Sequence, residues 1–390
     1  MSGSLFDVYA RSDLAFERGT GPWLYAVGDD EPYLDMMAGI AVNSLGHANP
    51  KLVEVLRDQA SALWHVSNTY RILEQEALAD CLVRLSCADK VFFCNSGAEA
   101  MECAIKTARR WAFVSGRPER TRFITFEGAT HGRTMATMAA GGKKKYLEGF
   151  GRTLDCFDQV PLNDMEAVKD RLCPETLGII IEPIQGSGGV RLVEDVFMKS
   201  LRDLCDAEDI LLIFDEVQTG VGRTGKMFAY EWPDVLPDIF ALAKGLGAGF
   251  PIGACLASDR VATGMTTKTH SSTLGGNLLA MVVARTVIEE VSRPDFLEHV
   301  RRISELLRNK LIALVQDYDH VFEEVRGRGL LLGLKSKLPI ADLLFAMRRS
   351  RLLCAPADDD VIRFVPPLNI EPEHVDEAVT RLVAALKTVK

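Results

Sequence analysis

The sequence predicts an α/β protein in which a mainly parallel sheet is followed by a smaller α+β domain. From about residue 91 to 257, short apolar runs alternate with segments of helical periodicity, which is the pattern of a parallel sheet. Beyond residue 278, long helical patterns come first and short strand-like runs follow them. At 390 residues, the chain is long enough for two such domains.

Two of the apolar runs end on ionisable residues. Residues 211–214 lead directly into Asp215, and residues 239–243 lead into Lys244. The residues after Lys244, GLGAGFPIG, are small and uncharged. Open α/β sheets bind their ligands at the carboxyl ends of strands, so we interpret Asp215 and Lys244 as site residues. For Lys244 taken alone, a surface lysine at a turn is the alternative.

A third junction predicts an anion site. A strand at 91–93 is followed by Ser96, Gly97 and Ala98 at the start of a helix. The first turn of a helix has free backbone N–H groups, which bind anions such as phosphate. The alternative is a plain turn in which Asn95 or Ser96 caps the helix.

Two further strand ends carry polar residues. A strand at 122–126 precedes a loop with His131 and Arg133, and a strand at 178–181 ends on Glu182 before a Gly-rich loop. Loops after strands commonly hold the functional residues of α/β proteins. We therefore treat these loops as candidate parts of the site.

The remaining segments have mainly structural patterns. Residues 1–20 form a mixed arm, and the Gly-broken stretch 35–49 is unlike a regular helix, with His47 predicted as a turn residue rather than a metal ligand. Helical spacing groups Val53, Leu56, Ala60 and Leu63 on one face, and Leu78, Leu82 and Leu85 on another. The predicted elements are a hairpin at 23–34, helices at 50–63, 73–85, 196–207, 279–291, 296–316 and 340–350, and strands at 330–334 and 362–364.

Composition excludes several classes of protein. The chain is 47% hydrophobic and 25% charged, which is ordinary for a globular protein, and its net charge of −9 argues against nucleic acid or an anionic membrane as partner. Nine scattered cysteines without metal-site spacing predict reduced thiols and no metal site. No apolar stretch has the length of a membrane span, and the first residues lack a signal-peptide pattern, so we expect a cytoplasmic protein.

Several motifs together resemble one family. They are YLDMMAGIAVNSLGH, FFCNSGAEA, THGRT, IIEPIQG, DEVQTGVGRTG, ALAKGLGAGFPIGA and IRFVPPLNI, and they extend over nearly the whole chain. This set resembles the class III pyridoxal-phosphate-dependent aminotransferases of fold type I, and within them the acetylornithine type. The resemblance implies a seven-stranded large domain at 61–277, a small domain at 278–390, and an N-terminal segment at 1–60 that joins the small domain. It also implies pyridoxal 5′-phosphate as cofactor and a homodimer with shared active sites.

The resemblance assigns roles to individual residues. Lys244 holds the cofactor covalently and then transfers protons as general acid and base, and Asp215 pairs with the pyridinium nitrogen. Arg133 binds the α-carboxylate of the amino donor, and Arg363 grips the dicarboxylate acceptor, for which a guanidinium suits better than lysine. The other assigned contacts are Gln218 to the ring hydroxyl, Ser96, Gly97 and Ala98 to the phosphate, Thr273 to the phosphate of the neighbouring subunit, Thr130 to the cofactor and Ser272 to the substrate.

Two positions depart from the family pattern. An aromatic residue that stacks on the cofactor ring usually precedes HGR, and here it is Thr130. A glutamate usually follows Gln185–Gly186 and neutralises the arginine that corresponds to Arg363, and here it is Ser187. Arg363 therefore stays available to anions, or another acid substitutes. We expect transamination to be kept and the donor preference to be shifted or broadened. Smaller departures are Met101, Ser271 and Leu279.

Four functions are compatible with these patterns to different degrees. The first is transfer of the ω-amino group of N-acetylornithine to 2-oxoglutarate by a ping-pong mechanism, as in arginine biosynthesis. The second is an ω-amine transaminase with another donor, for which Thr130 leaves space. A mutase or decarboxylase is the third, and a non-enzymatic binding protein, in which Lys244 is unconstrained, is the fourth.

Overall fold

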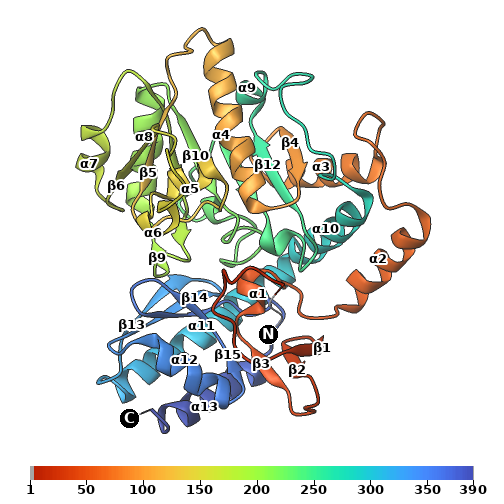
Figure 1. Ribbon diagram of the computed structural model, residues 1–390, viewed down its shortest axis with the longest axis vertical. Helices are drawn as coiled ribbons and strands as arrows, with labels where there is room; N and C mark the ends of the chain where they lie inside the picture. Colours follow the sequence, from red (N-terminus) through yellow and green to blue (C-terminus); the bar gives the residue numbers. More distant parts are fainter. Residues whose placement is uncertain (1–3, 390) are drawn as a thin grey trace.

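The computed structural model describes residues 4–389, and within them the core is a seven-stranded sheet of order β4-β12-β11-β10-β7-β5-β6, called the central sheet (Figure 1). The pairs from β11 to β6 are parallel, whereas β12 is antiparallel to both of its neighbours. The predicted mainly parallel sheet is confirmed. Its strands are β4 (Lys90–Cys94), β5 (Arg122–Phe126), β6 (Phe157–Val160), β7 (Thr176–Ile181), β10 (Leu211–Asp215), β11 (Ile239–Leu242) and β12 (Gly253–Ala257).

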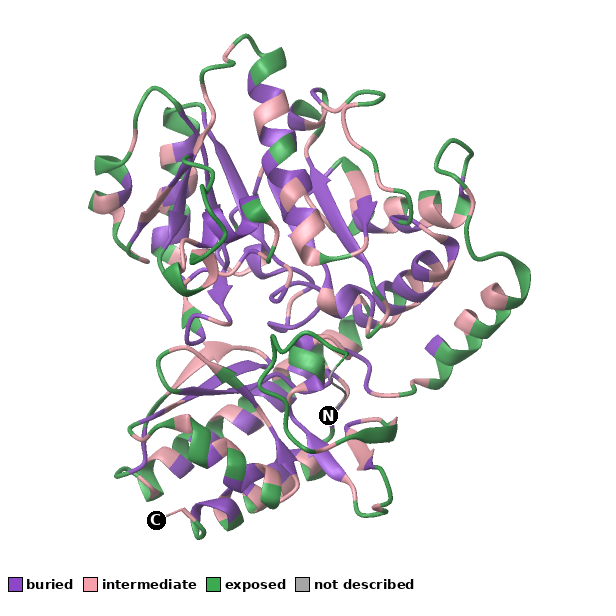
Figure 2. Ribbon diagram, viewed as in Figure 1, coloured by how far each residue is buried: buried purple, intermediate pink, exposed green. Residues whose placement is uncertain are grey.

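Both faces of the central sheet are covered. In β10, Leu211 and Ile213 pack into the apolar cluster of α4, whereas Leu212 and Phe214 pack into the cluster that contains Phe197 of α8. Alternate side chains of a strand point to opposite faces, so a strand buried on both faces is apolar throughout. Figure 2 shows these strands buried between helices that are exposed on their outer sides. The helices around the sheet are α2 (Pro50–Ala62), α3 (Leu73–Leu85), α4 (Gly97–Val114), α5 (Met135–Gly141), α6 (Lys144–Leu147), α7 (Met165–Asp170), α8 (Asp195–Ala207), α9 (Asp259–Ala262) and α10 (Leu278–Val291).

The C-terminal part of the chain forms a second sheet of order β13-β14-β17-β16, in which every pair is antiparallel. In Figure 1 this sheet and its helices lie below the central sheet, beside the N-terminal strands. Those strands form a third sheet with a C-terminal strand, because β3 pairs in parallel with β15. The elements are α11 (Pro294–Asp317), α12 (Ile340–Arg349), α13 (Pro372–Leu386), β13 (Phe322–Arg328), β14 (Leu331–Ser336), β15 (Leu352–Leu353), β16 (Ala355–Ala357), β17 (Val361–Phe364), β1 (Phe16–Thr20), β2 (Trp23–Ala26) and β3 (Tyr33–Asp35).

The predicted hairpin and helices occur in the structure. Leu78 and Leu82 of α3 face inward, whereas Leu85, which was expected to face inward with them, is exposed. Val53 and Leu63, which share the apolar spacing of the α2 region, are exposed as well. Helical periodicity identifies an apolar face, but it does not say whether the same chain covers that face. The strands β1 and β6 and the helix α13 were not predicted.

The Gly-broken segment after β3 is held by a side chain. Asp35 accepts hydrogen bonds from the backbone N–H groups of Met37 and Ala38 at 3.0 and 2.8 Å, and its other oxygen lies 2.8 Å from His47 Nε2. The single turn α1 (Ala38–Ala41) contains left-handed residues at Gly39 and Ile40, so it is not a regular helix, as predicted. His47 has a structural partner in Asp35, and no cluster of metal-binding side chains occurs within residues 4–389.

Candidate active site

A cavity of about 360 Å³ opens where β10 and β11 end. Its walls come from four loops that follow strands of the central sheet and from the segment before β12. Within the described part of the chain, six of the predicted site residues line it: Ser96, Gly97, Ala98, Thr130, Asp215 and Lys244. His131, Val217 and Phe250 line it as well.

Asp215 is buried at the end of β10 and is paired with His131. Its Oδ2 lies 2.8 Å from His131 Nδ1, and its Oδ1 accepts from the backbone N–H of Val217 at 3.1 Å. Burial opposes a charge on His131, but the hydrogen bond and the charge of Asp215 outweigh it and raise the His131 pKa. The pair therefore fixes the position of the Asp215 carboxyl group beside an imidazole whose protonated form it favours. The sequence placed His131 in a candidate loop but did not predict this partner.

Lys244 follows β11 in a strained backbone conformation, with a φ of 38°. Burial, with the charge of Arg363, lowers the pKa of its ammonium group to about 8. The backbone next to Lys244 is held by a side chain, since Ser44 Oγ donates a hydrogen bond to the carbonyl of Gly245 at 2.8 Å. A lysine with this pKa has a substantial neutral fraction near neutral pH, as a nucleophile or base requires.

The first turn of α4 faces the same cavity. Ser96 is its N-cap, and Ser96 Oγ accepts from the backbone N–H of Glu99 at 3.2 Å. The capping alternative is therefore correct for the Ser96 side chain, and it leaves the backbone N–H groups of Gly97 and Ala98, which line the cavity, for an anion. A Cβ added at Gly97 would come within 2.8 Å of Val217, so the close packing of this turn requires glycine.

Glu182 is a second buried carboxylate, and it contacts the backbone of Thr130. Its Oε1 accepts from the backbone N–H of Thr130 at 2.7 Å. Burial and the charge of Asp215 raise the pKa of Glu182 to about 7. Thr130 is thereby fixed through its backbone, and its Oγ1 accepts a hydrogen bond from Lys143 Nζ at 3.0 Å.

Arg363 is 3% exposed, so it is a buried residue of β17 and not a surface arginine. Its Nη1 donates to Gln218 Oε1 at 2.9 Å and its Nη2 to the carbonyl of Pro356 at 3.1 Å. Both partners are neutral, and burial lowers the Arg363 pKa to about 10. Ser187 supplies no charge. A buried guanidinium with neutral partners is prepared to receive an anion.

Five predicted site residues do not line the cavity that Lys244 lines. Two of them, Gln218 and Arg363, are buried and hydrogen-bonded to each other. Arg133 is exposed, and its guanidinium lies 3.8 Å from the ring centroid of Tyr146. Ser272 and Thr273 lie on the loop before α10, where Asn95 Nδ2 donates to Ser272 Oγ at 3.3 Å. The roles of these residues remain predictions.

Comparisons with known proteins agree on one family. The class-III aminotransferase family matches residues 8–386. The acetylornithine aminotransferase of Agrobacterium fabrum is 56% identical over 381 residues, covering 98% of this chain and 95% of that protein. The chain belongs to the class-III aminotransferases. A crystal structure of N-acetylornithine aminotransferase from Stenotrophomonas maltophilia matches with a TM-score of 0.84 at 40% identity, covering 97% of each chain. The ornithine aminotransferase of Toxoplasma gondii matches with a TM-score of 0.94 at 29% identity, covering 98% of this chain and 93% of that one.

Class-III aminotransferases use pyridoxal 5′-phosphate, and the groups around the cavity of this aminotransferase fit that cofactor. Lys244 offers an amine to its aldehyde, the first turn of α4 offers N–H groups to its phosphate, and Asp215 offers a carboxylate to its ring nitrogen. Two buried nitrogens near the cavity, His131 Nε2 and Arg363 Nε, have no hydrogen-bond partner within residues 4–389. These two nitrogens are available to hydrogen-bond a bound cofactor or substrate.

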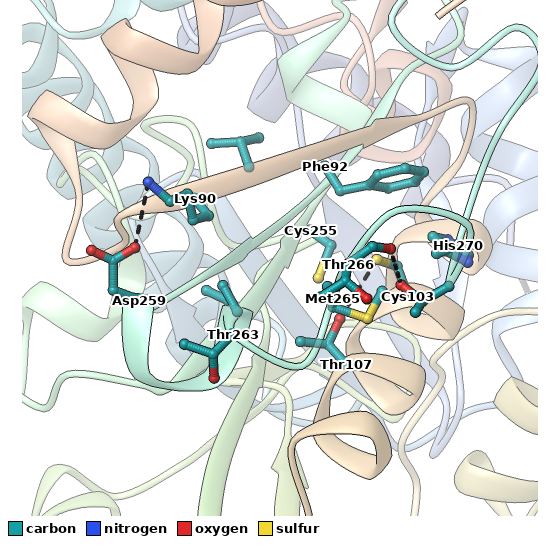
Figure 3. Close-up of a pocket in the computed structure, with 14 residues that line it drawn as sticks. Lys90, Phe92, Cys103, Thr107, Cys255, Asp259, Thr263, Met265, Thr266 and His270 are labelled. Atoms are coloured by element: carbon teal, nitrogen blue, oxygen red, sulfur yellow. Dashed lines mark hydrogen bonds and ion pairs between the residues drawn. The ribbon is translucent and has the colours of Figure 1, made fainter. Parts of the chain in front are cut away.

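A second cavity of about 380 Å³ lies between α4, β12 and the segment after α9 (Figure 3). Figure 3 shows Cys103, Cys255 and His270 among the residues around it. Its two strongly charged residues, Lys90 and Asp259, pair with each other at 3.4 Å. None of the predicted site residues lines this cavity, so it is separate from the active site of the aminotransferase.

Proposed function

We propose that this aminotransferase moves the ω-amino group of N-acetylornithine to 2-oxoglutarate, giving the semialdehyde and glutamate by a ping-pong mechanism. The observation that carries the proposal is the cavity in which Lys244, Asp215 and the α4 N-terminus meet, since these groups fit an amino-transfer cofactor. The names of the similar proteins from Agrobacterium fabrum and Stenotrophomonas maltophilia support N-acetylornithine as the donor.

Different residues of the chain have different roles in the proposed reaction. When bound, pyridoxal phosphate supplies an electron sink that stabilises negative charge on the substrate carbon. Asp215, held by His131, would keep the ring nitrogen protonated, and Lys244 would move the proton between substrate atoms as general acid and base. Gln218 would hold the ring hydroxyl, and the backbone N–H groups at the N-terminus of α4 would hold the phosphate.

Arginines at both sides of the site bind substrate carboxylates in this proposal. Arg363, buried with neutral partners, binds the dicarboxylate acceptor. Arg133 binds the α-carboxylate of the donor, and this requires its guanidinium to leave the ring of Tyr146. Ser272 adds a substrate contact. A bidentate guanidinium–carboxylate pair gives the orientation that transfer requires.

The functional unit is a homodimer in this proposal, with Thr273 reaching the phosphate of the partner subunit. Large apolar side chains beside the Thr273 loop support it: Trp64 is 63% exposed and Tyr70 is 72% exposed. Asn68 Nδ2, between them, donates to the carbonyls of Ser272 and Gly275 at 3.0 Å, so this apolar segment and the Thr273 loop form one surface. Exposed apolar patches of this kind mark protein interfaces.

A cytoplasmic location completes the proposal. Nine free thiols within the described part of the chain support a reducing compartment. No helix among residues 4–389 is long and apolar enough to cross a membrane.

Thr130 favours a second candidate, an ω-amine transaminase with a broader donor range. Steady-state rates for a panel of amines with 2-oxoglutarate decide between the two. We expect kcat/KM for N-acetylornithine to exceed that for ornithine and other ω-amines by at least about tenfold, which corresponds to roughly 1.4 kcal/mol of transition-state binding. A panel in which several amines match N-acetylornithine supports the broader range. Formation of glutamate separates both candidates from a mutase or decarboxylase.

A further inference from the structure

Three cationic side chains surround one aromatic ring near the site. Arg133 lies 3.8 Å from the ring centroid of Tyr146, Lys145 lies 5.1 Å from it and Lys143 lies 6.0 Å from it. Two of these cations, Lys143 and Lys145, share a single carboxylate, that of Asp358. The group of charges is therefore positive overall, next to the loop that holds Thr130.

Lys143 and Lys145 differ in what else they contact. Lys143 Nζ lies 2.7 Å from Asp358 Oδ2 and donates to Thr130 Oγ1 at 3.0 Å, and its side chain is 12% exposed. Lys145 Nζ lies 3.0 Å from Asp358 Oδ1, and its side chain is 57% exposed. Only Lys143 reaches a residue that lines the cavity, so Lys145 serves as its matched control.

Asp358 connects this pair to the strand of Arg363. It lies in the turn between β16 and β17, and its backbone N–H donates to the carbonyl of Ser187 at 2.9 Å. Burial opposes its ionisation, but hydrogen bonds from Lys143 and Lys145 lower its pKa. The charges of Glu182 and Asp358 both act on Arg363, where they favour the charged guanidinium. Of these two acids, Asp358 is the one that is hydrogen-bonded to Ser187 and paired with Lys143.

We propose that Lys143 is a specificity residue that binds the distal carboxylate of a dicarboxylic 2-oxo acid together with Arg363, and that Asp358 occupies this place until the acid binds. Lys143 then exchanges one carboxylate partner for another, which avoids leaving a poorly solvated ammonium without a counter-charge. Thr130 stands where the family usually has an aromatic residue, and in this proposal its hydroxyl positions Lys143 to recognise a carboxylate. This inference rests on the proposed transfer to a 2-oxo acid.

The test measures the two half-reactions separately on the cofactor-loaded enzyme, and it measures the affinity for glutarate, a dicarboxylate without an oxo group, by calorimetry. Lys143→Met should weaken the binding of glutarate and of 2-oxoglutarate about tenfold, the usual effect of losing a charge-assisted hydrogen bond. The monocarboxylate pyruvate should react unchanged, and so should the amino donor. Lys145→Met should change the glutarate affinity less than about twofold.

Asp358→Asn should change the glutarate affinity in the opposite direction to Lys143→Met. Removal of the competing carboxylate should tighten glutarate binding, whereas a merely structural role for the Lys143–Asp358 pair predicts weaker binding in both variants. Equal glutarate affinities of the wild type and Lys143→Met overturn the inference. If the wild type accepts no amino group from N-acetylornithine or other amines, the proposed function itself fails, and the glutarate titration still reports on Lys143.

Discussion

The site has two regions that are built in different ways. The floor, comprising Asp215, His131 and Lys244, lies at strand ends of the central sheet or in the loop after one, and Asp215 and His131 are each less than 5% exposed. The wall comprises Thr130, which lines the cavity, and Lys143 and Asp358, which do not line it and are joined to Thr130 by hydrogen bonds and ion pairs of 2.7–3.0 Å; all three are partly exposed loop residues. A rigid sheet fixes the groups that do chemistry, whereas loops carry the groups that select the substrate.

Replacing Lys244 should have the largest effect, because no other lysine among the described residues 4–389 lines this cavity. Lys244→Ala should lose essentially all turnover, by roughly the 10⁴-fold or more that loss of a covalent catalyst causes. The variant should still bind the cofactor non-covalently, as equilibrium dialysis would report. A near-normal rate of glutamate formation would overturn the assignment of Lys244.

Asp215→Asn should come next. An amide does not hold the ring nitrogen protonated, and the His131 pKa should fall because its anionic partner is lost. We expect kcat to fall by roughly 10²- to 10³-fold, the range seen when a positioned electrostatic group is removed. NMR titration of His131 reports the second effect.

The control for Asp215 is its neighbour. Glu216 is held by Thr219 Oγ1 at 2.6 Å and by the backbone N–H of Tyr230 at 2.9 Å, and it does not line the cavity. Glu216→Gln should keep kcat within about twofold. Equal losses in the two variants mean that the effect of Asp215 is structural.

We expect a substitution in the wall to have a smaller effect on activity than those in the floor. Thr130→Phe restores an aromatic side chain and removes the hydroxyl that accepts from Lys143. Cofactor packing should tighten and the donor range should narrow, with a change in relative kcat/KM of about three- to tenfold between bulky and slender amines. An unchanged donor profile contradicts the placement of Thr130 beside the substrate.

The smallest effect is on stability, and it depends on pH. Burial raises the pKa of Glu182 and Glu216 from 4.5 to about 7, so the folded chain retains protons that the unfolded chain has released. The free energy of unfolding should therefore fall as the pH rises from 4.5 to 7. Lys244 has the opposite effect. Its pKa is lowered from 10.5 to about 8 in the folded chain, so the unfolded chain binds more protons between these pH values and the free energy of unfolding should rise there. Urea titrations of the cofactor-free protein measure both slopes, and Glu216→Gln should flatten the first.

The floor could be predicted from the sequence because its chemistry is encoded locally. An apolar strand followed by Asp215, and another followed by Lys244, are short-range patterns, and the parallel sheet brings their ends together. The wall could not be predicted in this way. Lys143 and Asp358 lie 215 residues apart, and no local pattern connects them.

Prediction from the sequence has a second limit, because helical periodicity does not show what covers an apolar face. Val53 and Leu63 occupy an apolar stripe, yet they are exposed in this chain. In Figure 2, α2 lies at the margin of the molecule with most of its surface exposed. Periodicity predicts that such a face is covered, and in the proposed homodimer a second copy provides the cover.

The most direct test of ping-pong transfer from N-acetylornithine is a single-turnover titration of the cofactor-loaded enzyme with N-acetylornithine in the absence of any 2-oxo acid. We expect one equivalent of N-acetylglutamate semialdehyde per site, loss of the visible absorbance, and then no further reaction until 2-oxoglutarate is added. Continued turnover without an acceptor, or no loss of absorbance, would contradict it.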